Sequence, residues 1–291
     1  MISQVLDDRV GFVQAALEQS SRQLEPVGNG KWCFRPREEG LRSVTATLEG
    51  VWLALVARPL PELLTDAPPW DLLQRNARLP GLAKFALMPD RSLQLRAELQ
   101  VFEDMDLGAR ICEVCAGFQS ACSLYEFSGT DTSHASAFEK ADLKRLCAET
   151  GWPFIERGPD KLLIELEVAN HFRQAALIPA GRGIHVSCEL VTCDSLLEPS
   201  QHAIASLLLS ASGVLRLVRG SLAEDSAGLE ATFVAPPCPS EISSALESLS
   251  VGCSLCGEEV KTLRDPAVAR RFLELRGWNV SAPARTKGQT Q

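Results

Sequence analysis

Two β-hairpin patterns, one in each half of the chain, constrain the fold more than any other feature. Residues 82–99 form the first, in which apolar and polar residues alternate on both sides of a turn at Pro89-Asp90. Residues 214–234 repeat this alternation in the second half of the chain. A period of two is typical of strands with one buried face. The sequence therefore predicts antiparallel sheets in both halves.

The first hairpin has one apolar and one polar face. Phe85 and Leu87 alternate with Lys84 on its first strand, and Arg96 and Glu98 stand on the polar face of its second strand. Charged side chains are mostly exposed in folded proteins, so we expect the face with Lys84, Arg96 and Glu98 to lie in solvent. This face would then contribute to solubility at the edge of a sheet.

Both hairpins stand at the same point in a series of helices and strands. The N-terminal half predicts the order α-β-β-β-α-β-β-α, and the C-terminal half repeats it with one additional strand. Trp152-Pro153-Phe154, after the first helix of the second half, is similar to Trp32-Cys33-Phe34 in the first. We therefore predict an α+β fold of two tandem units, in which helices pack on antiparallel sheets.

The segment between the halves has the composition of a linker. Residues 128–137, S-G-T-D-T-S-H-A-S-A, are small and polar and show no periodicity. They divide the chain into predicted domains at 1–127 and 138–279. Beyond the repeat, we expect an added C-terminal helix at 265–275 and a disordered tail at 280–291.

Charge and hydropathy narrow the classes of partner. The 291 residues carry a formal net charge of −8, with a pI near 5.2. Affinity for nucleic acid comes from clustered lysine and arginine, so we do not expect nucleic acid to be a partner. The longest apolar run, residues 203–218, is interrupted by polar residues and is shorter than the ~20 residues of a membrane span. Two aspartates stand where a signal peptide would be basic and apolar, so we expect a cytoplasmic protein without membrane insertion.

The ten cysteines include two C-x-x-C pairs. Cys112 and Cys115 fall on the apolar face of a predicted helix, whereas Cys253 and Cys256 follow a predicted helix at 240–249 in a knuckle-like turn. Four thiolates can bind zinc tetrahedrally, so a zinc-binding regulatory protein that uses both pairs is the alternative function. In a reducing cytosol, most of the thiols are instead expected to be reduced, buried and free of metal.

The sequence contains no motif typical of catalysis. Gly28-Asn29-Gly30-Lys31 lacks the earlier glycine and the following serine or threonine of a phosphate-binding loop. The four histidines have no partner at metal-ligand spacing, and no G-x-S-x-G nucleophile motif occurs. We therefore predict a protein that is not an enzyme and uses no cofactor.

One predicted strand is apolar on both faces. Residues 51–57, V-W-L-A-L-V-A, show no alternation with polar residues. Such a strand is either buried between its own helices, or has a second face that the sister domain or a client segment covers. If a client covers it, Trp32, Trp52, Ala54 and Val56 are expected to form the binding surface for a protein or peptide.

Residues 70–99 predict a helix, a short break and a hairpin with a polar turn. Their sequence is W-D-L-L-Q-R-N-A-R-L-P-G-L-A-K-F-A-L-M-P-D-R-S-L-Q-L-R-A-E-L. With the predicted order of elements, this segment resembles the class I type III secretion chaperones and the YbjN-like family, which shares their fold. In that family two single-domain protomers pair, and an unfolded client segment wraps around the dimer against apolar patches without catalysis.

The resemblance implies a non-enzymatic polypeptide-binding protein, acting as a chaperone or adaptor. Its two halves would form a built-in dimer with pseudo-two-fold pairing of the domains. It also implies a monomer in solution, because the surface that a single-domain relative uses for dimerisation would already be occupied.

Overall fold

The computed structural model describes residues 2–37, 41–58, 60–61, 64, 67–102, 105–123, 138–168 and 171–277. The described residues form helices and two six-stranded antiparallel sheets, which confirms the predicted α+β class. The predicted linker at 128–137 and the predicted tail at 280–291 lie outside these residues. None of the described helices is long and apolar enough to cross a membrane.

The N-terminal half contains one sheet with the strand order β1-β2-β3-β4-β6-β5. Its elements are α1 (Ile2–Ser20), β1 (Ser21–Gly28), β2 (Lys31–Pro36), β3 (Ser43–Glu49), β4 (Trp52–Arg58), α3 (Pro69–Arg78), β5 (Lys84–Leu87), β6 (Leu93–Gln100) and α4 (Leu107–Cys122). Strands β5 and β6 are the first predicted hairpin.

The C-terminal half contains the second sheet, with the order β7-β8-β9-β10-β12-β11. Its elements are α5 (Lys140–Thr150), β7 (Phe154–Glu156), β8 (Leu162–Val168), β9 (His171–Ala180), β10 (Gly183–Thr192), α6 (Glu198–Val214), β11 (Arg219–Ala223), β12 (Ser226–Phe233), α7 (Pro239–Thr262) and α8 (Pro266–Leu275). The strand order is therefore the same in both sheets.

Strand β1 was not expected from the sequence. It is an edge strand whose residues after Ser21 are mostly exposed, and it contains Pro26, so it lacks the apolar alternation that marks a half-buried strand. Because β1 corresponds to β7, each half has four strands before its middle helix, and the additional strand expected in the second half is wrong. The proposed match of Trp152-Pro153-Phe154 to Trp32-Cys33-Phe34 is wrong as well, since Phe154 lies on β7 and Trp32 on β2.

Strand register gives a residue-by-residue correspondence between the halves. One cross-strand row of the first sheet contains Cys33, Thr45, Val56, Arg96 and Lys84. The equivalent row of the second sheet contains Leu163, Ala176, Ser187, Glu230 and Arg219. Lys84 and Arg219 therefore occupy equivalent positions, each at the start of an edge strand.

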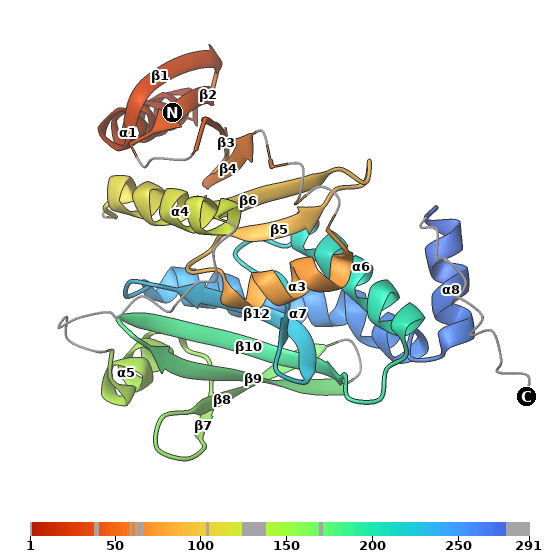
Figure 1. Ribbon diagram of the computed structural model, residues 1–291. Coiled ribbons are helices and arrows are strands. Elements are labelled where there is room, and N and C mark those ends of the chain that lie inside the picture. The colour runs from red at the N-terminus through yellow and green to blue at the C-terminus, as the bar shows by residue number, and fades with distance from the viewer. Residues whose placement is uncertain are drawn as a thin grey trace, which may run out of the picture.

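Helices cover one face of each sheet and also fill the space between the sheets. The pair α1 and α4 packs on the first sheet, and the pair α5 and α7 packs on the second. Figure 1 shows α3 and α6 between the two sheets, where α3 packs on β11 and α6 packs on β5. Each middle helix therefore contacts the edge strand of the opposite half, and these contacts join the two halves into one molecule.

Helix α7 is longer than the sequence predicts. It extends over 24 residues, so the expected helix end at residue 249 and the knuckle-like turn at Cys253 and Cys256 are wrong. A Cβ atom at Gly252 would lie 2.5 Å from Leu229 Cδ1 and 2.7 Å from Leu215 Cδ1. Glycine therefore allows α7 to approach the hairpin closely, and this packing outweighs its low helix propensity.

Candidate functional site

The structure divides the predicted client surface between the two faces of the first sheet. Trp32 lies on the helix-covered face, where only 2% of its surface is exposed. Trp52, Ala54 and Val56 are half-buried on the opposite face, because successive residues of a strand point in opposite directions. Trp32 is therefore a core residue and does not share a surface with the other three.

A segment of the C-terminal half lies on this opposite face. The guanidinium of Arg216 stacks over the Trp52 ring, 4.8 Å from its centroid, and Arg216 Nη2 is 3.9 Å from Glu49 Oε2. Arg96 donates a hydrogen bond of 3.2 Å to the carbonyl oxygen of Gly213. The end of α6 and the connection to β11 thus cover part of the surface predicted for a client. This agrees with the alternative that the sister domain covers the second face of the strand at 51–57.

Lys84 is completely buried at this junction, so its predicted exposure is wrong. Its Nζ atom lies 2.6 Å from Glu98 Oε2 and donates to the carbonyl oxygens of Leu215, at 2.5 Å, and Val218, at 3.1 Å. Glu98 is only 4% exposed. Burial lowers the pKa of Lys84, and the attraction of Glu98 opposes this shift. The polar face of the first hairpin therefore binds the other half of the protein instead of facing solvent.

Arg219 makes the reciprocal contact from the second half. Its Nε and Nη2 atoms lie 2.9 and 2.8 Å from Glu230 Oε1, and both side chains are nearly fully buried. Three further hydrogen bonds, of 2.7 to 2.9 Å, go to the carbonyl oxygens of Leu79, Gly81 and Ala83, and a fourth, of 3.3 Å, goes to the hydroxyl of Thr232. A buried cation of each half therefore satisfies backbone acceptors of the other half.

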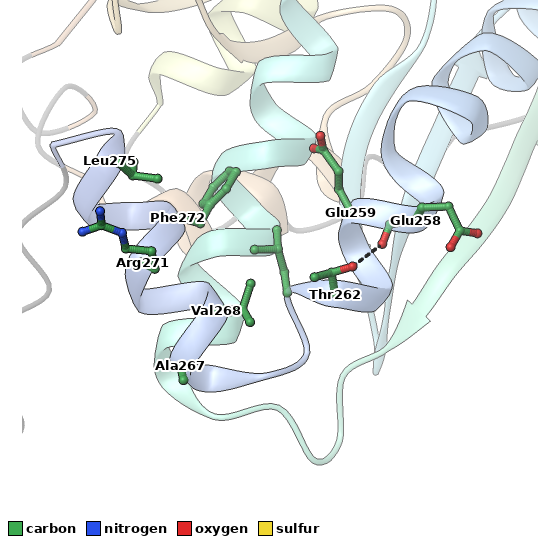
Figure 2. A pocket seen from close by; sticks show the side chains of 9 residues that line it. Glu258, Glu259, Thr262, Ala267, Val268, Arg271, Phe272 and Leu275 are labelled. Carbon is green, nitrogen blue, oxygen red and sulfur yellow. Dashed lines mark hydrogen bonds between the residues drawn. The ribbon is translucent and has the colours of Figure 1, made fainter.

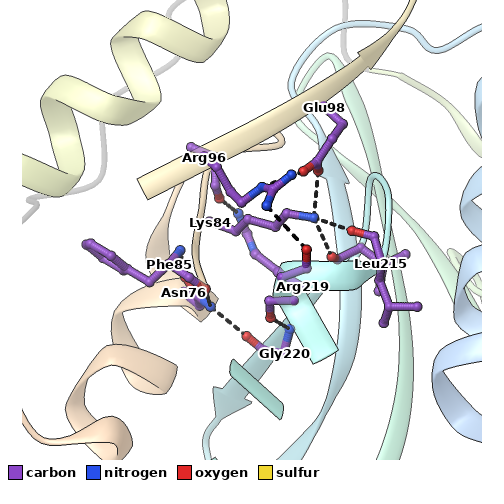
Figure 3. A network of polar contacts seen from close by, with 12 residues as sticks. Asn76, Lys84, Phe85, Arg96, Glu98, Leu215, Arg219 and Gly220 are labelled. Atoms are coloured by element: carbon purple, nitrogen blue, oxygen red, sulfur yellow. Dashed lines mark hydrogen bonds and ion pairs between the residues drawn. The ribbon is translucent and has the colours of Figure 1, made fainter. Parts of the chain in front are cut away.

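Two short polar side chains complete this network, which Figure 3 shows. Asn76 of α3 accepts from the Phe85 N–H at 2.7 Å and donates to the carbonyl oxygens of Phe85 and Gly220, at 3.1 and 2.9 Å. Ser212 of α6 accepts from the Gly220 N–H at 2.7 Å. The two middle helices thus hydrogen-bond to β5 and β11, so the polar network fixes the position of the two sheet edges.

The two C-x-x-C pairs lie on helices α4 and α7. Cys112 is partly exposed on α4, while Cys115, Cys253 and Cys256 are buried. In the described part of the chain, no group of three or more histidine, cysteine, aspartate or glutamate side chains is arranged to hold a metal ion. The two pairs thus lie on helices of different halves, and the Sγ atom of Cys253 lies 3.4 Å from that of Cys188 on β10.

A groove of about 650 Å³ lies between the end of α7 and α8, and its sides are shown in Figure 2. Its apolar surface comes mainly from α8, where Val268, Phe272 and Leu275 are spaced by four and three residues. Val268 is 39% exposed and Leu275 is 70% exposed. The groove is therefore an apolar surface that no described part of the chain covers.

Charged residues lie along the rim of the groove. Glu258 of α7 pairs with Lys261 at 2.6 Å, and this hydrogen bond lowers the pKa of the Glu258 carboxyl. Arg271 of α8 pairs with Glu274 at 3.4 Å. Glu259, which also lines the groove, has no ion pair with a cation among the described residues. The rim therefore adds a negative charge to an apolar groove.

The chemistry of the groove suits binding. The hydroxyl of Thr262 donates to the carbonyl oxygen of Glu258 at 3.0 Å, as is common within helices. None of the residues that line the groove places a nucleophile in a hydrogen bond to a general base, which is the arrangement that covalent catalysis requires. What the groove offers a ligand is apolar contact area and an acidic rim.

The sequence contained a partial signal for this groove. Val268, Phe272 and Leu275 follow the spacing of one helix face, and the helix at 265–275 was predicted. The other wall was not predicted, because the helix before it was expected to end at residue 249.

Comparisons with known proteins give no relative for this chain, since no family model, curated protein or solved structure matches it.

Proposed function

We propose that this protein is a non-enzymatic polypeptide-binding protein of the cytoplasm, a chaperone or adaptor, and that a client segment places apolar side chains in the groove between α7 and α8. The observation that carries the proposal is the groove itself, with Leu275 and Val268 exposed beside the partly buried Phe272. Exposed apolar grooves of this kind commonly accept the apolar face of an amphipathic helix.

The arrangement of the two halves supports a built-in dimer of two related domains. Both sheets have the same strand order, and α3 and α6 each pack on the edge strand of the opposite half. This is what a pair of related domains joined in one chain would give. In this proposal the pseudo-dimer is the scaffold, and α8, which the first half lacks among its described elements, supplies the binding groove.

Charge indicates which clients would bind. The chain has a net charge of −8, and Glu259 and Glu258 stand at the rim of the groove. A client with an apolar segment and basic flanking residues is therefore the best electrostatic match, and its affinity is expected to fall as salt is added. The proposed partner is a protein or peptide, with no role for nucleic acid or membrane.

The protein is expected to be a monomer in solution. The edge strands β5 and β11 are covered within the chain by α6 and α3, so these two sheet edges are not open to a second copy. Light scattering should therefore give a mass of 31.6 kDa at micromolar concentration. A stable species of twice this mass would contradict the internal pairing.

Substitution of Leu275 by aspartate is expected to weaken client binding by tenfold or more. The change places a charge in an apolar contact without removing any buried group, since Leu275 is 70% exposed, and tenfold corresponds to about 1.4 kcal/mol. Fluorescence anisotropy should be measured with synthetic peptides in which a leucine- and phenylalanine-rich amphipathic segment is flanked by lysines. The same segment flanked by glutamates should bind more weakly.

Two further variants make this experiment decisive. Val27→Asp is the matched control, because Val27 is 66% exposed on β1, outside the groove, and should bind like the wild type. Trp52→Ala tests the sheet surface: loss of binding at an unchanged melting temperature would place the client there. Equal binding by Leu275→Asp and wild type would exclude the groove, and no binding of either peptide by the wild type would contradict polypeptide binding.

A further inference from the structure

Two buried thiols from distant parts of the chain meet between α7 and the second sheet. Cys188 of β10 and Cys253 of α7 have their Sγ atoms 3.4 Å apart, although they are 65 positions apart in the sequence. Only 2% of Cys188 and 1% of Cys253 is exposed. The sulfur atoms would have to approach by about 1.4 Å to reach the ~2.0 Å of a disulfide bond.

The two thiols have different roles in their hydrogen bond. Cys253 donates to Cys188, and this hydrogen bond lowers the pKa of Cys188. The Arg173 guanidinium also lowers this pKa, whereas burial and the Glu189 carboxylate raise it. The same bond and burial raise the pKa of Cys253. Cys188 is therefore the better thiolate, and Cys253 holds a proton beside it.

Arg173 provides a positive charge at this site. It lies on β9, and its Nη1 atom donates to the carbonyl oxygen of Glu189 at 3.2 Å. Its buried Nε atom has no hydrogen-bond partner among the described residues. An anionic sulfur at Cys188 would be stabilised by the positive charge of this guanidinium.

We propose that Cys188 and Cys253 are a site of oxidative modification, at which hydrogen peroxide converts the two thiols into an intramolecular disulfide. The Cys188 thiolate attacks one peroxide oxygen, the O–O bond breaks, and the hydroxide that leaves takes up a proton to become water. The sulfenic acid on Cys188 is then attacked by the Cys253 sulfur. The S–S bond forms, the S–O bond breaks, and the Cys253 proton leaves with the departing hydroxide as a second water.

The overall reaction is balanced. Two thiols lose two electrons and two protons, and one peroxide is reduced to two molecules of water. The product links β10 to α7 and closes a long loop of the chain, so it constrains the unfolded state. The oxidised protein should therefore resist urea at higher concentrations than the reduced protein.

Cys256 is a matched control on the same helix. It is 1% exposed and follows Cys253 by three residues, but burial raises its pKa to about 12, and Glu259 acts in the same direction. Because of this raised pKa, the Cys256 thiol is expected to react less with peroxide, although Cys256 and Cys253 are equally buried. Peroxide should therefore distinguish two cysteines that differ in their partner rather than in their exposure.

The experiment treats the full-length reduced protein with hydrogen peroxide, unfolds it, and alkylates the remaining thiols before mass spectrometry. Eight of the ten cysteines should be alkylated, peptide mapping should show the link between Cys188 and Cys253, and dithiothreitol should restore ten. Cys253→Ser should abolish the link, and Cys256→Ser should leave it in place.

The same data can overturn the proposal without any variant. Ten alkylated cysteines after treatment, a disulfide between other residues, or sulfinic acid on Cys188 without a link would each contradict it. Because the mapping uses the wild-type protein, failure of Cys253→Ser to fold would not affect the result.

Discussion

Replacement of Arg219 by methionine is expected to lower the free energy of unfolding by about 3 to 5 kcal/mol, the usual cost of breaking a buried ion pair. The change leaves Glu230 as a charge that is only 3% exposed and has lost its partner. It also removes the donors of three backbone carbonyl groups in the first half, those of Leu79, Gly81 and Ala83. Urea unfolding followed by circular dichroism measures this loss.

Two other variants separate the loss of the Arg219–Glu230 ion pair from the general effect of replacing an arginine by methionine. Arg182 is an exposed arginine in a turn, so Arg182→Met should change stability by no more than about 0.5 kcal/mol. Glu230→Met combined with Arg219→Met removes the unpaired charge, and a coupling of about 1 to 3 kcal/mol is expected in the double-mutant cycle. If Arg219→Met alone costs less than about 1 kcal/mol, the ion pair does not hold the halves together.

Alternation was reliable where one face of a strand lies under a helix. The sequence pattern predicts strands at residues 161–168, 172–179 and 184–192, and β8, β9 and β10 begin and end within one residue of these ranges. Helix α7 packs on all three strands. Strand β1 was missed because an edge strand with few buried residues has no such pattern. Periodicity therefore detects burial by helices, and edge strands without a buried face escape it.

The polar face of the first hairpin shows what periodicity cannot predict. The pattern separated Lys84 and Glu98 correctly from Phe85, but it placed them in solvent. The actual environment of Lys84 depends on the carbonyl groups of Leu215 and Val218, 131 and 134 positions away. Local sequence determines which residues share a face, whereas the partner of that face is a property of the whole fold.

The binding groove was unpredictable for a related reason. The apolar stripe of α8 was visible, but a groove needs two walls, and the second wall is the end of α7 beyond residue 249. Glycine and serine in this part of α7 reduce its helix propensity, and only contacts such as that of Gly252 with Leu229 explain why the helix continues. In the same way, Trp32 was assigned to a client surface because apolar character alone does not indicate which face is open.

Replacement of Lys84 by methionine is expected to lower the free energy of unfolding by about 3 kcal/mol, and to loosen the junction between the halves before the rest of the molecule. The variant leaves the carbonyl groups of Leu215 and Val218 without this donor. It also removes one of the two cations that pair with the buried Glu98, the other being Arg96, whose Nε atom lies 2.7 Å from Glu98 Oε1. Hydrogen exchange should therefore speed up most in β5, in β11 and in the connection before β11, and least in α1. Lys31→Met, at an exposed lysine of the same sheet, should leave both stability and exchange unchanged. Uniformly faster exchange across both sheets would show that Lys84 stabilises the fold as a whole, and would contradict a specific role in joining the halves.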